Sequence, residues 1–406
     1  MKKLTTFLLL LAFSLSGYQV TSQSCFQDGD GNWVQANGAD CVNSIITAVP
    51  FLRIVPDARS GAMGDVGIAI SPDANSIHYN ASKLAFVDKD ISVAATYTPW
   101  LRALGIPDVY LAYIAGYKQI NDLQTVGLSL RYFSLGDIAF TDEQGGSLGN
   151  GRPNEFEIAL AYARKLSPKL SVAVTPKFIY SNLAGGQSVE GIDITPGVAG
   201  AADFSLTYKT PLKLSGKESD LTVGFAVSNL GTKISYTKSI NKDYIPTNLG
   251  LGAAWNMNID EFNSFTFAVD INKLLVPTPC QGTAEECDED ANGILDYKEK
   301  SMFSGVLSSF GDAPGGGSEE LRELMYSIGL EYWYDKQFAV RAGYYSEHST
   351  KGNRKFFTVG LGLKYNIFGL NFSYLVPTTN QRNPLDNTLR FTLLFDFGAF
   401  APDDVE

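Results

Sequence analysis

The segment "RFTLLFDF", residues 390–397, contains the clearest pattern in this sequence. Its odd-numbered positions all hold Phe or Leu, whereas Arg390, Thr392 and Asp396 occupy even-numbered positions. A period of two places alternate side chains on opposite faces of a β-strand. Residues 359–365 alternate in the same way, and similar segments recur back to residue 91. The pattern therefore predicts a large sheet of strands that each have two different faces.

About fourteen such segments, most of them near ten residues long, are separated by turn-forming residues. An even number of antiparallel strands of this length is typical of bacterial outer-membrane barrels. Because lipid offers no hydrogen bonds, only a closed sheet satisfies every backbone group there. We predict an all-β fold, a transmembrane antiparallel β-barrel of about 14 strands over residues 91–397, in the bacterial outer membrane. The strands are expected to begin near residues 91, 107, 123, 154, 169, 193, 220, 247, 263, 324, 337, 354, 368 and 386.

The lengths of the connections support this prediction independently. Outer-membrane barrels have short turns on the periplasmic side and long loops outside. If the first strand rises outward, the periplasmic connections are mostly tight, as in "QIND" at 119–122 and "LSPK" at 166–169. Most outer connections are longer, and the one at 274–323 is the longest; those near 102–106 and 349–353 are short. Residues 398–406 are then a periplasmic tail.

The start of the chain predicts export. Lys2 and Lys3 precede an apolar run and small or polar residues, which is the pattern of a secretory signal peptide over residues 1–23. No later stretch is long and apolar enough for a transmembrane helix. The formal net charge of −11 argues against a nucleic-acid partner, because binding phosphates needs clustered Lys and Arg.

Four cysteines form two local pairs in the sequence. In an oxidising compartment these residues favour disulfides, and the pairing Cys25–Cys41 with Cys280–Cys287 closes the shortest loops among three connectivities. A zinc site is a poorer interpretation, since the chain has two histidines and no pair of cysteines at zinc-ligand spacing.

The outer connection contains "DEDANGILDYKE", residues 288–299, which has the spacing of an EF-hand calcium loop. Gly293 occupies the position of the sharp turn, and the loop follows Cys287 directly. We predict a structural, extracellular calcium site rather than a sensor. Its ligands are expected to be Asp288, Asp290, Asn292, the Ile294 carbonyl, Asp296 and Glu299.

Residues 24–90 are predicted to be an N-terminal extension and a plug for the barrel lumen. The stretch 50–86 is too rich in Gly and Pro for a long helix and too apolar for a linker. A barrel of this size has a lumen wide enough to need filling. The expected plug residues are Arg59, Gly61, Gly64, Asp65 and Asn80, with Arg59 and Asp65 as an ion pair and Arg53 as a second cation.

"PDARSGAMGDVGIA" and "DANSIHYNASKLAF", within residues 56–86, resemble the N-terminal signature of the PorV family of the type IX secretion system. That family belongs with the FadL-type transporters, whose plug has an Asn-Pro-Ala element; here Asn80-Ala81-Ser82 stands at that place. The resemblance implies a shuttle without enzymatic activity. It would take secreted proteins with a conserved C-terminal domain from an SprA-type translocon and pass them to a cell-surface attachment complex.

Two other functions remain open from the sequence. A FadL-type channel for hydrophobic small molecules would need an apolar internal pocket, whereas a shuttle needs an exposed apolar surface on its outer loops. Residues 301–310, "SMFSGVLSSF", would supply such a surface if they are exposed. A lipopolysaccharide deacylase, which the resemblance also suggests, would need His348 as its base, near Ser346 and Glu347.

Overall fold

The computed structural model describes residues 25–28, 33–35, 40–102, 105–141, 146–189, 192–214, 217–238, 242–378 and 388–398. The predicted signal peptide and nearly all of the predicted C-terminal tail lie outside these residues. The chain divides into two compact units, residues 1–41 and 42–406. In the first unit, β1 (Cys25–Gln27) pairs with β2 (Trp33–Gln35), and a disulfide joins Cys25 to Cys41.

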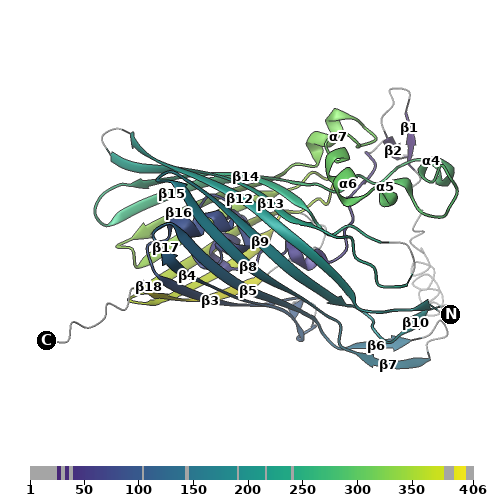
Figure 1. The fold of residues 1–406 in the computed structure, drawn as a ribbon, viewed down its shortest axis with the longest axis horizontal. Coiled ribbons are helices and arrows are strands. Elements are labelled where there is room, and N and C mark those ends of the chain that lie inside the picture. Colours follow the sequence, from purple (N-terminus) through teal and green to yellow (C-terminus); the bar gives the residue numbers. More distant parts are fainter. Residues whose placement is uncertain are drawn as a thin grey trace, which may run out of the picture. The chain divides into compact units, whose positions relative to one another are not determined.

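The second unit is a closed barrel of fourteen antiparallel strands in the described part of the chain (Figure 1), as the alternation predicts. Consecutive barrel strands are hydrogen-bonded neighbours, and β20 pairs with β3 to close the sheet. Every strand begins within about four residues of its predicted start, the largest difference being 193 against Gly197. The strands are β3 Ile91–Pro99, β4 Val109–Asn121, β5 Gln124–Leu135, β8 Asn154–Ser167, β9 Leu170–Asn182, β12 Gly197–Leu214, β13 Lys217–Gly231, β14 Asn248–Asn258, β15 Asn263–Leu274, β16 Met325–Tyr334, β17 Phe338–Ser346, β18 Lys355–Tyr365, β19 Phe368–Pro377 and β20 Leu389–Phe397.

The barrel wall exposes its apolar face outward. On β4, for example, Ile114 is 53 % exposed between the buried Tyr113 and Ala115. A water-soluble protein would not expose so many large apolar side chains in one continuous band. The outward band is therefore the surface that contacts lipid, and the inward positions face the lumen.

The two ends of the barrel differ, as the loop lengths predict. At the inner end the strands are joined by tight turns, such as the one between β16 and β17, where Asp335 and Lys336 both have a φ of 52°. Two successive left-handed residues match the right-handed twist of paired strands. The outer connections carry two hairpins and four short helices at the opposite end (Figure 1). These are β6 Ile138–Thr141 with β7 Ser147–Gly151, β10 Ser188–Val189 with β11 Ile192–Asp193, α4 Ala284–Cys287, α5 Asp296–Glu299, α6 Met302–Ser308 and α7 Gly317–Arg322.

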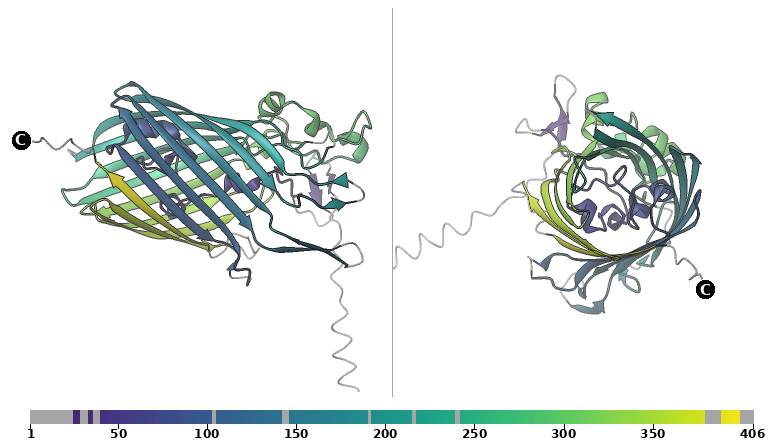
Figure 2. Two further views of the ribbon diagram at one scale, coloured as in Figure 1. Left: turned by 60° about the horizontal axis from the view of Figure 1, so that its bottom comes forward. Right: turned by 90° about the vertical axis from the view of Figure 1, so that its left-hand side faces the viewer.

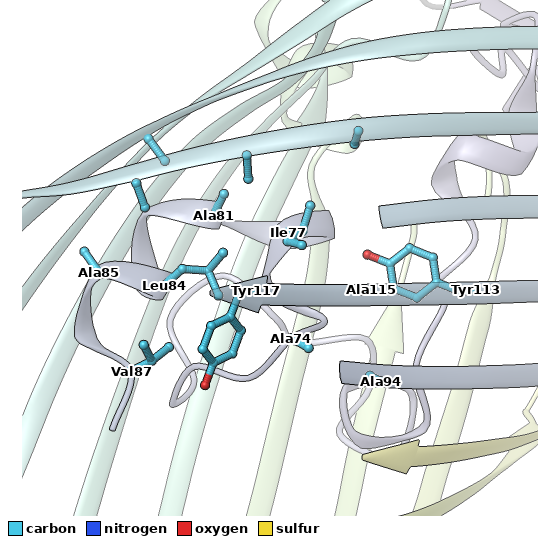
Figure 3. Packing of buried hydrophobic residues seen from close by; sticks show 14 residues of the cluster. Ala74, Ile77, Ala81, Leu84, Ala85, Val87, Ala94, Tyr113, Ala115 and Tyr117 are labelled. Atoms are coloured by element: carbon cyan, nitrogen blue, oxygen red, sulfur yellow. The ribbon is translucent and has the colours of Figure 1, made fainter. Parts of the chain in front are cut away.

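The segment before the first barrel strand lies inside the lumen (Figure 2). It forms η2 (Pro50–Arg53), α2 (Ala58–Gly61), α3 (Ser76–Tyr79) and η3 (Ala81–Phe86). Ile77 and Leu84 of this plug pack with Tyr113 of β4 in one buried cluster (Figure 3). No helix in the described residues is long and apolar enough to cross a membrane.

Candidate functional site

The plug runs through the barrel from its outer end to its inner end. At the outer end, the Asn43 side chain donates hydrogen bonds to Pro279 O and to Glu319 Oε1, both at 3.1 Å. At the inner end, Gln119 N donates to Asp90 O at 2.7 Å, just before β3 begins. The plug is therefore held at both mouths of the barrel.

A buried charge triad fixes the middle of the plug to the wall. Arg59 of α2 donates to both carboxylate oxygens of Glu331 on β16, at 2.8 and 2.9 Å. Arg341 of β17 donates to the same carboxylate at 2.6 Å. Burial alone would lower the pKa of Arg59, but the nearby Glu331 carboxylate outweighs it and holds that pKa above its ordinary value.

The predicted pair of Arg59 with Asp65 is wrong. Arg59 instead contacts Glu331 and, at 3.3 Å, Asp73, while Arg53 pairs with Glu347 at 3.2 Å. Asp65 follows Gly64 in a left-handed turn, with a φ of 67°, and this turn separates it from the guanidinium of Arg59. Its Oδ1 atom is buried without a hydrogen-bond partner. Burial raises the pKa of Asp65 to about 6, although Arg390 and Arg354 oppose the shift.

Asn80 is a hydrogen-bonding centre of the plug. Its side-chain nitrogen donates to Ile68 O and to Thr207 Oγ1 of β12, both at 2.9 Å, and its Oδ1 accepts from Ser82. Because the Asn80 side chain joins two parts of the plug to the wall, the Asn80-Ala81-Ser82 element is fully engaged in packing.

The turn at Gly64 rests on a wall position that lacks a side chain, whereas Gly61 lies against the side chain of Arg390. A Cβ atom at Gly343 of β17 would lie 2.0 Å from Gly64 N, which no real side chain can tolerate. Gly64 itself has a φ of 68° and lies against the backbone of Tyr344. Glycines in both the plug and the wall therefore allow backbone-to-backbone contact, which leaves no passage there.

The space that remains between plug and wall is small, and charged side chains line it together with apolar ones. A cavity of about 120 Å³ is lined by Asp65, Lys177, Asp270 and Arg354, among others. Asp270 of β15 accepts hydrogen bonds from Gly67 N at 2.7 Å and Ile68 N at 2.9 Å, so it also binds the plug. This cavity is not the apolar pocket that a channel for hydrophobic molecules needs.

Both histidines make hydrogen bonds within the protein. His78 of the plug accepts from the Arg131 guanidinium through Nδ1 and packs edge-on against Tyr79. Burial and the Arg131 charge hold the pKa of His78 well below its ordinary value, so the ring is neutral. His348 Nδ1 accepts from Thr350 N at 3.3 Å within the outer connection after β17.

Ion pairs that the sequence does not predict anchor the long connection between β15 and β16 to the barrel. Glu323, which follows α7, accepts from Lys273 of β15 at 2.5 Å and from Lys351 at 3.0 Å. Glu320 adds a second contact to Lys273 at 2.9 Å. The sequence shows only acidic residues near a short helix, and nothing in it identifies the two distant lysines as their partners.

Within the same connection, a disulfide joins Cys280 to Cys287 immediately before the acidic loop. Carboxylate oxygens of Asp288, Asp290 and Asp296 lie within 4.8 Å of one another; Asp290 is exposed, and the other two residues are partly buried. Beyond this loop, Phe303 and Leu307 of α6 are 66 % and 75 % exposed, and Phe310, just after the helix, is 53 % exposed. They lie in the connection between β15 and β16, outside the strands that form the apolar band.

Comparisons with known proteins identify the family. No curated protein matches this sequence. Among solved structures, the chain is similar to the Pseudomonas putida toluene transporter TodX, with 12 % identity, 87 % of this chain and 98 % of that chain covered, and a TM-score of 0.47. The Ralstonia pickettii toluene transporter TbuX is 10 % identical, with 84 % of this chain and 98 % of that chain covered and a TM-score of 0.47. A Pseudomonas aeruginosa FadL homologue is 10 % identical, with 88 % of this chain and 100 % of that chain covered and a TM-score of 0.41.

A family model described as "Type IX secretion system protein PorV" matches residues 36–281, which is more than half of the 406 residues. This match includes the plug and the first nine strands of the barrel, up to β15. The chain is thus an outer-membrane β-barrel and belongs to the PorV family of the type IX secretion system.

Proposed function

We propose that this protein is an outer-membrane shuttle of type IX secretion. It binds secreted proteins that carry the conserved C-terminal domain at an SprA-type translocon and passes them to the cell-surface attachment complex. Membership of the PorV family supports the secretion role. The architecture supports a surface role as well, because the plug fills the lumen and the outer connections form a firmly anchored platform.

The exposed apolar face of α6 carries the proposal. Phe303 and Leu307 are four residues apart and therefore lie on one side of α6, and Phe310 follows two residues after the helix ends at Ser308. All three are more than half exposed, at the end of the barrel that the loop lengths predict to face away from the periplasm. Clustered apolar side chains on an aqueous surface mark protein–protein contact sites. A client or translocon domain with a complementary apolar patch is the partner that this face suits.

The charges of the lumen argue against the alternative, a FadL-type channel for hydrophobic molecules. Arg131, Glu331 and Arg341 are inward-facing and at most 2 % exposed. An apolar solute that crossed this lumen would have to separate buried ion pairs, at a cost of several kcal/mol. The two pockets in the described lumen have volumes of only about 120 and 150 Å³, and charged side chains line each of them.

The test is affinity purification from native outer membranes in a mild detergent, followed by mass spectrometry. We expect the unmodified protein to retain a very large translocon barrel and secreted proteins that still have their C-terminal domains. A variant with Phe303→Ser, Leu307→Ser and Phe310→Ser should lose these partners. Phe262→Ser, at an inner turn where the side chain is 51 % exposed, is the matched control and should retain them.

Recovery of partners by both variants would refute the role of α6. Recovery of the barrel alone, with a co-purified fatty acid or other apolar ligand, would instead establish the channel.

We also propose that residues 288–299 bind calcium, as a structural element of the outer connection. Gly293 has a φ of 82°, and its N–H donates to Asp288 Oδ2 at 2.8 Å, which turns the loop around this carboxylate. Asn292 donates to Asp290 Oδ2 and to Glu299 Oε1, both at 2.8 Å, so the first and last halves of the loop already converge. Oxygen ligands gathered in this way suit a hard divalent cation.

Calorimetric titration with Ca²⁺ tests this second proposal. An isolated extracellular loop is expected to bind with a dissociation constant on the order of 10⁻⁴ to 10⁻³ M. Glu299→Gln removes the closing carboxylate and should abolish the binding heat. Glu289→Gln removes a carboxylate from a non-ligating position of the same loop and should leave it unchanged. Equal loss in both variants would mean that only the general acidity of the loop attracts the ion.

A further inference from the structure

The membrane-facing wall of the barrel contains an apolar groove. It crosses β3, β4, β5 and β8, has a volume of about 440 Å³, and is lined by Val93, Ile114, Leu128 and Leu160. Gly116 forms its floor, because this outward-facing position of β4 has no side chain. A Cβ atom there would lie 3.2 Å from Ser92 O and 3.4 Å from a methyl group of Val93, so a larger side chain at this position would fill the groove.

Basic side chains stand at the inner end of this groove. Lys118 lines it, three residues before the end of β4. Arg164 lies at the corresponding end of β8, two strands and therefore about 10 Å to the side. Both side chains are exposed, and neither makes a hydrogen bond or an ion pair with another described residue. The groove thus ends beside two exposed positive charges, at the end of the barrel that is predicted to face the periplasm.

The aromatic residues near the inner end support a special role for this sector. On β16 to β19, outward-facing aromatic side chains stand at the inner strand ends, where barrels usually carry an aromatic girdle. The strands β3, β4 and β5, all described there, present Val93, Lys118 and Val126 near the corresponding ends instead. The residues on β16 to β19 are Tyr332, Tyr334, Phe338, Tyr365 and Phe368, and Tyr162 of β8, which is 41 % exposed, borders the sector on its other side.

From these features we infer that the groove binds a phospholipid of the periplasmic leaflet. One acyl chain lies over Gly116, and the phosphate is bound by Lys118 with Arg164 beside it. Ile114 to Lys118 span about 13 Å along the strand, enough for a large part of an acyl chain. The charge of the headgroup phosphate complements the two cations, and only an acyl chain among the molecules around the barrel matches a lining that is almost wholly apolar. This site is separate from the lumen and does not depend on the shuttle proposal.

The full-length protein in vesicles of phosphatidylcholine tests the site. The probe is a phosphatidylglycerol with a photoreactive diazirine in one acyl chain, and mass spectrometry locates the cross-links. We expect cross-links concentrated in peptides from β4 and β5. Gly116→Leu, which fills the groove, should lose most of them. Gly200→Leu, at an exposed outward position of β12 that has nothing within 4 Å, is the matched control and should keep them.

A second pair of substitutions separates the headgroup from the chain. Lys118→Gln with Arg164→Gln leaves the groove open, so cross-linking should persist while its preference for phosphatidylglycerol over a photoreactive phosphatidylcholine is lost. Migration on unheated gels shows whether each variant is a folded barrel. Even labelling around the barrel, or equal labelling of Gly116→Leu and Gly200→Leu when both are folded, would overturn the proposal. So would cross-linking of this face to a protein instead of lipid in native membranes.

Discussion

At the scale of single residues, one carboxylate carries a large share of the contact between plug and wall. Glu331 is 1 % exposed and accepts from two arginines, Arg59 of the plug and Arg341 of the neighbouring strand. A buried charge is tolerated only when it is paired and hydrogen-bonded. Each of these three side chains therefore depends on the other two.

Replacing Glu331 by Ala should destabilise the barrel strongly. It leaves two guanidinium groups buried without a counter-charge, which costs on the order of 3 to 5 kcal/mol. The measurement is the free energy of unfolding by urea in detergent micelles. Arg152→Ala is the control, because the ion pair of Arg152 with Asp137 is exposed and its loss should not be measurable. If the free energy of unfolding of Glu331→Ala changed as little as that of the control, water would be shown to solvate the two guanidinium groups in place of the carboxylate.

Asp65 makes stability depend on pH in the opposite direction from an ordinary paired carboxylate. Its pKa rises to about 6 on folding because burial disfavours the ionised form. The folded state then binds more protons than the unfolded state between about pH 4 and pH 6, so the Asp65 contribution becomes unfavourable as pH rises through that window. The penalty is fully present above pH 6 and absent below pH 4.

Asp65→Asn should therefore stabilise the protein at pH 7.5 by up to about 3 kcal/mol and leave it unchanged at pH 4. Asn accepts the left-handed backbone of this position, so strain stays the same. Unfolding midpoints of both proteins at the two pH values provide the check. A variant less stable at pH 7.5 would show that the charge of Asp65 is needed by Arg390 or Arg354.

At the scale of elements, the outer connection between β15 and β16 owes its position to α7 and the residues after it. Glu320 and Glu323 reach two lysines, Lys273 on the barrel wall and Lys351 in another outer connection. Glu319 joins the same network through Lys351 and through Asn43 of the plug segment. The platform that bears α6 is thus tied to the wall, to a second loop and to the plug.

Removing both cations with Lys273→Ala and Lys351→Ala should free α7 from the barrel. The acidic side chains would lose their partners, and the helix is too short to be stable alone. Hydrogen–deuterium exchange should show faster exchange of residues 317–323, by one order of magnitude or more. Lys298→Ala serves for comparison, since its pair with Asp243 is half exposed and contributes little. Unchanged exchange in the double variant would mean that packing alone holds α7.

At the scale of the whole molecule, plug and barrel behave as one packed body. The plug is bound at both mouths, at the triad and at the glycine contacts of Gly343 and Gly64. An interior packed this densely does not deform gradually; it keeps one arrangement or switches between two discrete ones. The wild-type barrel is accordingly expected to conduct no measurable ion current in planar bilayers.

Gly343→Val should displace the plug and open a conducting path, because its side chain would occupy the space of the Gly64 backbone. The measurement is single-channel current across a planar bilayer. Gly200→Val, on the outward face, adds the same side chain without a neighbour and should stay closed. Current in the wild type, or none in folded Gly343→Val, would contradict the sealed lumen.

The sequence by itself determined the architecture of this protein. Alternation such as that of residues 390–397 reports a strand with one apolar face, and the physics of the bilayer admits only a closed sheet of such strands. Loop lengths predict which end faces outward, and the span from residue 50 to 86 has a composition that suits a lumen plug. Each of these signals lies within a short stretch of the sequence, so it can be recognised without knowledge of the fold.

Only the tertiary structure decided which charges meet. Arg59 pairs with Glu331 rather than Asp65, although Glu331 is 272 positions away and Asp65 is six. Two features determine this pairing: the left-handed turn at Gly64 and Asp65, and the inward position of Glu331 on β16. Neither feature can be recognised from the spacing of charged residues in the sequence. The same holds for the lysines that bind α7 and for the groove at Gly116, which exists because four strands meet around a missing side chain.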